Sequence, residues 1–402
     1  MSGESMRILT INSGSSSLKF ALYRTGSSET LLQAGRIERI GHRPALFRVR
    51  DAAGQTLIDE SPSMPDHDAA LNRLFEWLKS GGPAPDLEAV GHRVVHGGMQ
   101  YDRPHRITSS LCDVLEALRP LAPDHLPHEI KAIRSVGIAY PTLPQVACFD
   151  TAFHRQMPPS AQHPALPREL WKEGVLRYGF HGLSYEYIVD ALRRERGKTA
   201  DGRLVIAHLG NGASMAAVDH GRSVDTTMGM TPTGGLVMSS RSGDLDPGML
   251  LYLLQEKGMK PAEVDEMVNQ KSGLLGISGA YSDMQELLDR EQENPHAAEA
   301  VALFCYQAKK FLGALAAVLG GVETLVFTGG IGENAPAVRE RICAGMGFLG
   351  IALDPTRNRA NASVISQEGS PTQVLVMKTN EELMIARQTH ALLRGGETKE
   401  TE

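Results

Sequence analysis

Three glycine-rich segments each follow a short apolar run, and each could bind phosphate. They are NSGSSS (residues 12–17), HLGNG (208–212) and TGGIGEN (328–334). Small residues let backbone N–H groups and serine hydroxyls come close to an anion, and Lys19 could add a point charge. One such segment is more simply a turn. Three of them, in both halves of the chain, favour a nucleotide between two domains, with the first two on its phosphates and the third on its adenosine.

Cationic side chains stand in the polar segments GHRVVHGG, YGFHG and SSRSGDLDPG. A lone arginine is usually a solvated surface charge, and a histidine here could equally be a core side chain bonded to the backbone. Residues 228–248, however, are rich in Gly, Ser, Thr and Pro, and irregular segments of this length are uncommon in a compact domain unless they are functional. The cations in these segments are His92, Arg93, His96, His181 and Arg241.

Two carboxylates stand where an α/β site would need them. Asp150 ends the apolar run QVACFD, and sites in α/β proteins lie at the carboxyl ends of sheet strands. An Asx turn or a helix cap is the alternative for Asp150. Glu381 follows Asn380 at the start of the last predicted helix, where an acidic residue also simply suits the helix dipole.

The composition predicts a soluble protein of two or more domains. The chain has 402 residues, 42% hydrophobic and 22% charged, enough for a large core. The formal net charge of −6 disfavours a nucleic-acid binder, because no excess of cations exists to neutralise a phosphate backbone. An anionic substrate must therefore be held by local cations and N–H groups.

The cysteines and the N-terminal segment bear on the compartment. Cys112, Cys148, Cys305 and Cys343 are scattered without CxxC spacing, which fits a reducing cytosol better than a disulfide framework or a zinc site. The N-terminus lacks a long apolar run, so we expect neither a signal peptide nor a membrane span. A cytoplasmic location is the expectation.

Apolar periodicity predicts the elements that must position these residues. Residues 9–23 read as a β-hairpin around NSGSSS, and residues 71–78 as a helix ended by Gly81 and Gly82. Ser184 is a plausible N-cap of the helix at 184–197. Further helices are expected at 129–137, 297–321 and 380–394, and strands at 145–149 and 323–328.

The opening pattern of strand, small-residue turn and strand recurs at Leu204. Asn12-Ser13-Gly14-Ser15 then corresponds to Asn211-Gly212-Ala213-Ser214. This repeat suggests a duplicated domain, and the alternation of strands and helices predicts an α/β fold with largely parallel sheets.

Nine motifs stand along the chain in this order: NSGSSSLKF, GHRVVHGG, FDTAFH, YGFHG, HLGNG, RSGDLDPG, SGLLGISG, TGGIGEN and TNEEL. In sequence and order they resemble the motifs of the acetate kinases, which belong to the acetate and sugar kinase, heat-shock ATPase and actin superfamily. The resemblance implies two duplicated ribonuclease-H-like domains with ATP in the cleft between them. The N-terminal domain would comprise residues 1–150 with the helix at 380–402 packed on it, and the nucleotide-binding domain residues 151–379.

The resemblance also implies roles for residues. Asn12 and Glu381 match positions associated with Mg²⁺, which Mn²⁺ could replace, and Arg93 matches the substrate-contacting arginine. Asp150 matches the catalytic aspartate, and His181 and Arg241 match the groups that stabilise the transition state. The ATP-binding positions would be Lys19, His208, Leu209, Gly210, Asn211, Gly212, Asp283, Gln285, Gly330, Ile331, Gly332, Glu333 and Asn334.

The implied reaction is in-line phosphoryl transfer from ATP to acetate, which gives acetyl phosphate and ADP. A carboxylate is already ionised at neutral pH, so catalysis must align two anions and stabilise charge rather than remove a proton. The expected partners are acetate, acetyl phosphate, ATP, ADP and a second copy in a homodimer, with neither nucleic acid nor membrane. A propionate or butyrate kinase and an ATP-driven conformational module are the alternatives.

Four positions depart from the family pattern. Asp124 stands in APDHLP where the family has an apolar residue beside the acyl pocket, and it either crowds that pocket or caps a turn in solvent. Leu183 and Tyr185 replace the usual residues after GFHG. Gln285 stands where the family has an arginine, so the hypothesis is that one nucleotide contact is weakened.

Overall fold

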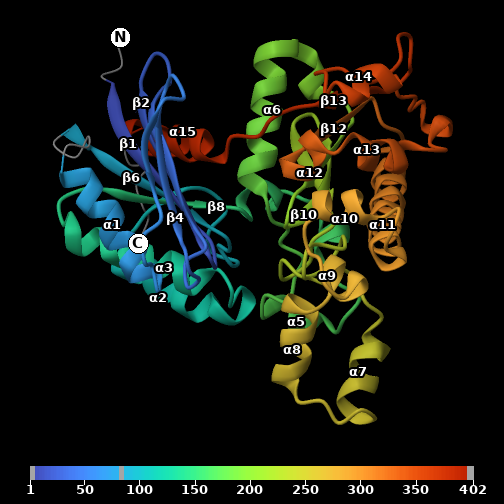
Figure 1. Cartoon of the computed structure of the whole chain (residues 1–402), viewed down its shortest axis with the longest axis horizontal. Coiled ribbons are helices and arrows are strands. Elements are labelled where there is room, and N and C mark those ends of the chain that lie inside the picture. The colour runs from blue at the N-terminus through green and yellow to red at the C-terminus, as the bar shows by residue number, and fades with distance from the viewer. Residues whose placement is uncertain (1–4, 81–85, 396–402) are drawn as a thin grey trace. The chain divides into compact units, whose positions relative to one another are not determined.

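The chain forms two compact units, seen in a computed structural model that describes residues 5–80 and 86–395 (Figure 1). Unit 1 comprises Met1–Ala152 and Asn380–Glu402, and unit 2 comprises Phe153–Thr379. Each unit is built on one β-sheet with helices packed on it.

The sheet of unit 1 has the strand order β5-β4-β3-β2-β1-β6-β8-β7. The first five strands form an antiparallel meander, whereas β6 runs parallel to β1 and β8 parallel to β6. The strands are β1 Met6–Ser13, β2 Ser17–Thr25, β3 Thr30–Glu38, β4 Leu46–Asp51, β5 Thr56–Glu60, β6 Ala89–Val94, β7 His105–Arg106 and β8 Gln145–Phe149.

Alternation along β1 and β2 sends side chains to both faces of this sheet. Leu9 and Phe20 join the core cluster with α1 (His67–Lys79) and α3 (Leu126–Ala139), while Ile8 and Ala21 join the cluster with α15 (Glu381–Arg394). Figure 1 shows where these three helices lie along the sheet. The last helix of the chain thus covers the face opposite α1 and α3. A further helix, α2 (Ser109–Leu118), packs on α3.

The sheet of unit 2 has the order β11-β10-β9-β12-β13. The helix α6 (Gly182–Arg196) covers one face through a cluster that includes Tyr185 and Ile188, and α11 (Pro295–Leu319) packs on β9, β10 and β11. The strands are β9 Leu204–Leu209, β10 Ala213–Asp219, β11 Arg222–Thr226, β12 Thr324–Thr328 and β13 Gln373–Val376.

Unit 2 also contains shorter helices, of which α7 and α8 lie away from the sheet (Figure 1). They are α4 Pro159–Gln162, α5 Arg168–Lys172, α7 Pro247–Gln255, α8 Pro261–Gln270, α9 Gly273–Ser278, α10 Met284–Arg290, α12 Gly329–Asn334, α13 Pro336–Cys343 and α14 Pro355–Arg359.

The long helix α11 is the one described helix with the length and apolar character of a membrane span. Core helices of soluble proteins pass the same test. Here Val301, Phe304, Ala308, Leu312 and Leu315 are buried at helical spacing, so this face of α11 belongs to the core of unit 2.

The two sheets share one topology, which confirms the predicted duplication. The order β3-β2-β1-β6-β8 in unit 1 matches β11-β10-β9-β12-β13 in unit 2, with two antiparallel pairs followed by two parallel ones in each. The two asparagines of the repeat are nevertheless not equivalent. Asn12 lies inside β1, paired with Lys19, whereas Asn211 lies in the turn after β9.

Three local expectations were wrong. The sheets are mixed rather than largely parallel, because short hairpin turns join the first strands of each unit. TGGIGEN is not an open turn, because its residues 329–334 form α12. Ser184 does not cap α6, because His181 occupies the N-cap position and Ser184 lies within the first turn. The predicted stop at Gly81 and Gly82 lies outside the described residues.

Candidate active site

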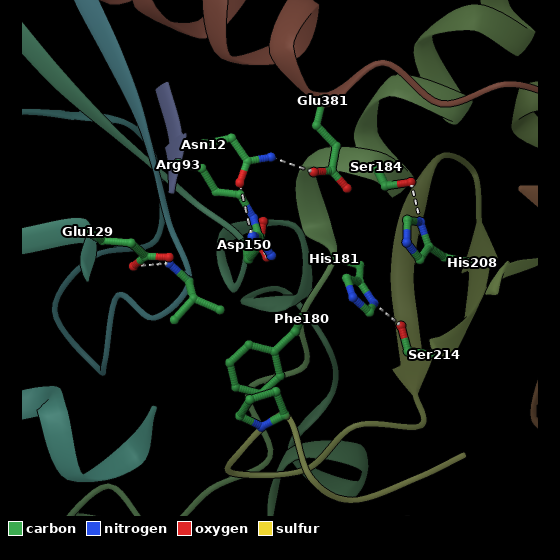
Figure 2. A network of polar contacts seen from close by, with 12 residues as sticks. Asn12, Arg93, Glu129, Asp150, Phe180, His181, Ser184, His208, Ser214 and Glu381 are labelled. Carbon is green, nitrogen blue, oxygen red and sulfur yellow. Dashed lines mark hydrogen bonds and ion pairs between the residues drawn. The ribbon is translucent and has the colours of Figure 1, made fainter. Parts of the chain in front are cut away.

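In unit 1, Arg93 and Asp150 form a buried ion pair at the ends of two neighbouring parallel strands. Arg93 lies near the end of β6 and Asp150 follows β8 directly. The Arg93 guanidinium donates to Asp150 Oδ2 from both Nε (3.0 Å) and Nη2 (2.5 Å) (Figure 2). The side chain of Asp150 is 0% exposed and that of Arg93 13%. Two donors on one acceptor fix the plane of the guanidinium.

The carboxylates around Arg93 keep it charged. Burial alone lowers the pKa of a guanidinium, but Asp150 and Glu381 outweigh burial and raise the pKa of Arg93. By contrast, burial lowers the pKa of His92 to about 4, and His96 accepts from the Gly98 N–H. His92, which was counted among the cations of GHRVVHGG, is therefore neutral. Arg93 is the charged side chain of this motif on β6.

Asn12 and Glu381 lie beside Arg93. Asn12 is on β1, and its Oδ1 accepts from Arg93 Nη1 (3.2 Å) while its Nδ2 donates to Glu381 Oε2 (3.3 Å) (Figure 2). Glu381 is the first residue of α15. No cluster of three or more His, Cys, Asp or Glu side chains suited to a metal occurs in the described residues. The Asn12 amide oxygen and the Glu381 carboxylate are two possible ligands for Mg²⁺. They fit the usual kind of Mg²⁺ site, in which substrate phosphates supply further ligands.

Lys19 lies on β2 directly opposite Asn12 and is exposed. The hairpin turn between them closes with a bond from the Gly14 N–H to the Ser17 carbonyl (2.8 Å). His67 Nε2 contacts the Gly14 carbonyl (2.8 Å) and so ties this turn to α1. The predicted hairpin is therefore confirmed, and its turn is held in place by the helix beneath it.

Glu129 is a buried carboxyl that the sequence reading missed. It lies in the first turn of α3, its Oε2 accepts from the Val95 N–H (3.0 Å), and it is 1% exposed (Figure 2). Burial raises the pKa of Glu129 to about 8, although the Arg93 charge and the Val95 bond oppose this shift. The signal was available, because Glu129 shares the apolar face of α3 with Leu126 and Ile133.

In unit 2, a hydrogen-bonded network surrounds His181. His181 Nδ1 lies 2.8 Å from Ser214 Oγ, and the Tyr185 hydroxyl lies 2.5 Å from the same oxygen. Ser184 Oγ lies 2.8 Å from His208 Nδ1, and the two imidazole rings stack with centroids 4.3 Å apart (Figure 2). Ser184, assigned to a cap from the sequence, thus orients His208 instead.

The backbone at His181 adopts the left-handed conformation, with φ of 60°. This region is costly for a residue with a Cβ and often marks functional positions. The corner is held by His154, whose Nε2 contacts the Phe180 carbonyl (3.0 Å) and whose Nδ1 contacts Ser223 Oγ (2.8 Å). The motif FDTAFH therefore also serves to fix the turn that presents His181.

Arg241 and the HLGNG segment meet His181. A Cβ built on Gly212 would lie 3.2 Å from His181 Nε2 and 3.7 Å from Arg241 Nη1. The Asn211 carbonyl accepts from the Ser239 N–H (3.1 Å), which ties HLGNG to the irregular segment carrying Arg241. Arg241 Nη1 also donates to the Pro232 carbonyl (3.2 Å). A glycine at 212 therefore leaves space between a ring nitrogen and a guanidinium.

The α12 segment adjoins HLGNG, because β9 and β12 are parallel neighbours. A Cβ on Gly210 would lie 3.9 Å from the Gly330 nitrogen, and one on Gly329 would lie 2.7 Å from the Leu209 carbonyl. Glu333 Oε1 accepts from the Gly329 N–H (3.0 Å) and thus caps its own helix. The predicted ATP-binding positions from His208 to Gly212 and from Gly330 to Asn334 are therefore brought together.

Asp283 and Gln285 make local contacts instead. Asp283 caps α10 by accepting from the Glu286 N–H (3.0 Å), and Gln285 Nε2 donates to Asp289 Oδ1 one turn later (2.8 Å). Asp124 lies in the loop before α3, half-buried and close enough to raise the pKa of His128 against the larger lowering by burial. These positions remain predictions.

The chain is similar to known proteins of one family. The model of the acetokinase family matches residues 7–387. The acetate kinase of Rhodopseudomonas palustris is 48% identical over 396 residues, which cover 97% of this chain and 99% of that protein. The acetate kinase of Methylocella silvestris is 47% identical, with 96% of this chain and 98% of that protein covered.

Two solved structures agree with this placement. The structure of Porphyromonas gingivalis acetate kinase has a TM-score of 0.86 and 38% identity, covering 97% of this chain and 100% of that one. The structure of a propionate kinase from Francisella tularensis has a TM-score of 0.89 and 35% identity, covering 96% and 99%. The resemblance drawn from the sequence motifs is confirmed, and the chain belongs to the acetokinase family.

Proposed function

We propose that this chain is an acetate kinase, which transfers the γ-phosphoryl group of ATP reversibly to acetate and gives acetyl phosphate and ADP. The observation that carries the proposal is the Arg93 guanidinium, which Asp150 holds rigidly beside Asn12 and Glu381. A protein that only hydrolysed ATP would have no need of a carboxylate-binding arginine. The names of the relatives and their near-complete coverage support the same activity.

In unit 1, Arg93 binds the acetate carboxylate and Asp150 keeps the guanidinium in position. Acetate is ionised at neutral pH, so no side chain has to remove a proton from it. Asn12 and Glu381 would hold Mg²⁺, or Mn²⁺ in its place. Bound there, that ion would supply positive charge that offsets the charge of the phosphates.

In unit 2, His181 and Arg241 meet the charge that develops on the transferring phosphoryl group. Both reach the space over Gly212, and preorganised donors of this kind are most effective where charge appears only in the transition state. Backbone N–H groups of HLGNG and of α12 hold the nucleotide, so unit 2 is the nucleotide-binding domain.

The protein acts as a homodimer through α7, a helix with no buried residue in the described structure. Met249, Leu251 and Tyr252 are 56%, 52% and 50% exposed. Neighbouring exposed apolar side chains of this kind mark interaction surfaces.

A hydroxylamine trap tests the activity. The purified chain is incubated with ATP, Mg²⁺ and acetate, propionate or butyrate, and acyl hydroxamate is measured. We expect acetyl hydroxamate that disappears when the metal is chelated. A folded preparation that forms no hydroxamate from any of the three acids would overturn the proposal. ADP release that no carboxylate stimulates would indicate an ATP-driven conformational module, and a preference for propionate or butyrate would indicate a kinase for longer acids.

A further inference from the structure

Three cations stand directly opposite one another across three strands of unit 1. Lys19 on β2 pairs with Arg36 on β3, and Arg36 pairs with Arg48 on β4. Directly opposite residues project from the same face of a sheet, so the three side chains form a row, which we call the cation ladder. Arg50 lies two residues further along β4 on the same face. The row begins beside Asn12, the register partner of Lys19.

Such a row of like charges does not stabilise the folded chain. Like charges directly opposite on neighbouring strands are destabilising. Glu38 pairs with Arg36 (3.1 Å) and Asp59 with Arg48 (2.9 Å), but exposed pairs of this kind contribute little. Within the described parts of the chain, neither Lys19 nor Arg50 makes an ion pair with a carboxylate. The four cations of this face therefore exceed by one the carboxylates that lie beside them, which are Glu38, Asp59 and Glu382.

The cation ladder lines a cavity of about 380 Å³, a volume in the range of small-molecule sites. The small residues Ala21, Ala34 and Gly35 also line it. The helix α15 packs mainly on β1, β2, β6 and β8, and only its first turn, through Glu382, contributes to the wall. Glu382 is half-buried; burial, with Glu381 beside it, raises the pKa of this carboxyl, and the Lys19 charge opposes this shift. The cavity thus combines an open sheet face with four cationic side chains.

We infer that this cavity is a second ligand site, which binds a small oligoanion carrying two or more phosphate or carboxylate groups. Two strand spacings separate Lys19 from Arg48, about 10 Å in all. A single acetate or phosphate could engage one end of this row but could not span it. Guanidinium groups bind both phosphate and carboxylate oxygens, often with two parallel bonds. A molecule with several anionic groups could contact these cations in addition to the exposed carboxylates that already pair with Arg36 and Arg48.

Titration calorimetry on the full chain tests the inference with two probes, tripolyphosphate and citrate. The test variant is Arg36→Gln combined with Arg48→Gln, and neither residue belongs to the proposed catalytic machinery. Arg24→Gln is the matched control, because Arg24 is an exposed arginine on β2 that does not line the cavity. Lys19 is left unchanged, since it is also a proposed ATP-binding residue.

We expect at least one probe to bind the unmodified chain and the Arg24→Gln variant alike, and to bind the double variant at least tenfold more weakly. Raising the salt concentration should weaken binding further, because the contacts are exposed and screened. Binding of tripolyphosphate alone would identify a phosphorylated ligand, and binding of citrate alone a polycarboxylate. Equal affinity in the double variant, or no binding of either probe, would overturn the inference.

The thermal midpoint gives an independent measurement. If the cation ladder exists for a ligand, removing two of its charges should leave the midpoint of the ligand-free protein unchanged or raise it, because repulsion is relieved. The same change should abolish the increase in midpoint that the bound probe causes. A midpoint that rises equally with probe in both proteins would show that the probe binds elsewhere.

Discussion

The side chains expected to do chemistry are each held in place by a neighbouring side chain. Asp150 fixes Arg93 in unit 1, and Ser214 contacts His181 in unit 2. Behind Ser214 stands Tyr185, fully buried, with its hydroxyl 2.5 Å from Ser214 Oγ. A hydroxyl chain of this kind determines which ring nitrogen of His181 carries the proton. The departure from the family pattern at Tyr185 therefore bears directly on a proposed catalytic group.

Tyr185→Phe should lower kcat and leave the KM for ATP within about twofold. Removing one hydrogen bond costs about 1 kcal/mol, which corresponds to a loss of roughly five- to tenfold in rate. Nitrogen-15 NMR of the His181 ring should show a changed balance of tautomers without any substrate. Tyr187→Phe, two residues along α6, is the control. An unchanged His181 spectrum would show that Tyr185 only fills space.

Arg241→Ala should lower kcat far more than it weakens ATP binding. In related phosphoryl transfers, a cation that meets the developing charge contributes about 10³–10⁵ in rate. Steady-state kinetics with acetate and ATP would measure the loss, and nucleotide binding would be measured separately by calorimetry. A loss of less than about tenfold in kcat, equivalent to about 1.4 kcal/mol, would mean that Arg241 is peripheral.

Glu129 should make the protein less stable as the pH rises from about 4.5 to about 8. Over this range the folded state retains the Glu129 proton, whereas the unfolded chain releases it. The folded state therefore binds more protons, and the free energy of unfolding falls as the pH rises. Arg93 and Asp150 are the charged groups that act on Glu129, and Arg93, whose pKa is raised, remains ionised through the window.

The measurement is the thermal midpoint at several pH values for the unmodified chain and for Glu129→Gln. The amide keeps a donor and an acceptor but cannot titrate, so the decline should be smaller in the variant. Parallel curves for the two proteins would show that other groups control the pH dependence.

At the scale of elements, α15 and α12 bring the proposed site residues to their sheets. The approach of α15 to β6 depends on Gly91, where a Cβ would lie 2.3 Å from Thr389 Oγ1 and 2.6 Å from Ile385 Cγ2. The α12 segment is held by Arg339, which is fully buried and donates to the Gly332 and Glu333 carbonyls (2.8 and 3.1 Å). In both cases a residue outside the site determines where the site residues stand.

Gly91→Ala should destabilise the protein by about 1–3 kcal/mol, because the added methyl group overpacks the contact with α15. It should also raise the Mg²⁺ concentration needed for activity, since α15 carries Glu381. Gly137→Ala in α3 is the control, because its Cβ would meet only Gln145 Nε2, at 3.4 Å, and alanine favours a helix. Equal thermal midpoints for the two variants would contradict this account.

At the scale of the whole molecule, the proposed homodimer would bury the exposed apolar side chains of α7 against a second copy of the chain. Leu251→Glu should shift the mass measured by light scattering from that of a dimer toward 43.5 kDa, because a buried charge without a partner is costly. Ile138→Glu is the control, since Ile138 is 83% exposed and stands in unit 1. A dimer that survives Leu251→Glu, or an unmodified chain that is monomeric, would reject α7 as the interface.

The sequence alone predicted the features that local spacing controls. The β1–β2 hairpin, the apolar faces of α1 and α11 and the strand before Asp150 all follow from periods of two or 3.6 residues. The family followed from long motifs in a fixed order. The repeat was also visible, because each half of the chain encodes the same strand, turn and strand.

Only the tertiary structure decided the features that depend on residues far apart in the chain. Ser184 was read as a cap from its neighbours, but its hydroxyl meets His208 on β9. Glu129 was read as an ordinary helix residue, but packing buries it against the end of β6. The cation ladder exists only because three strands align in one register. Spacing along the chain specifies which face a side chain takes, whereas packing between elements specifies what that side chain meets.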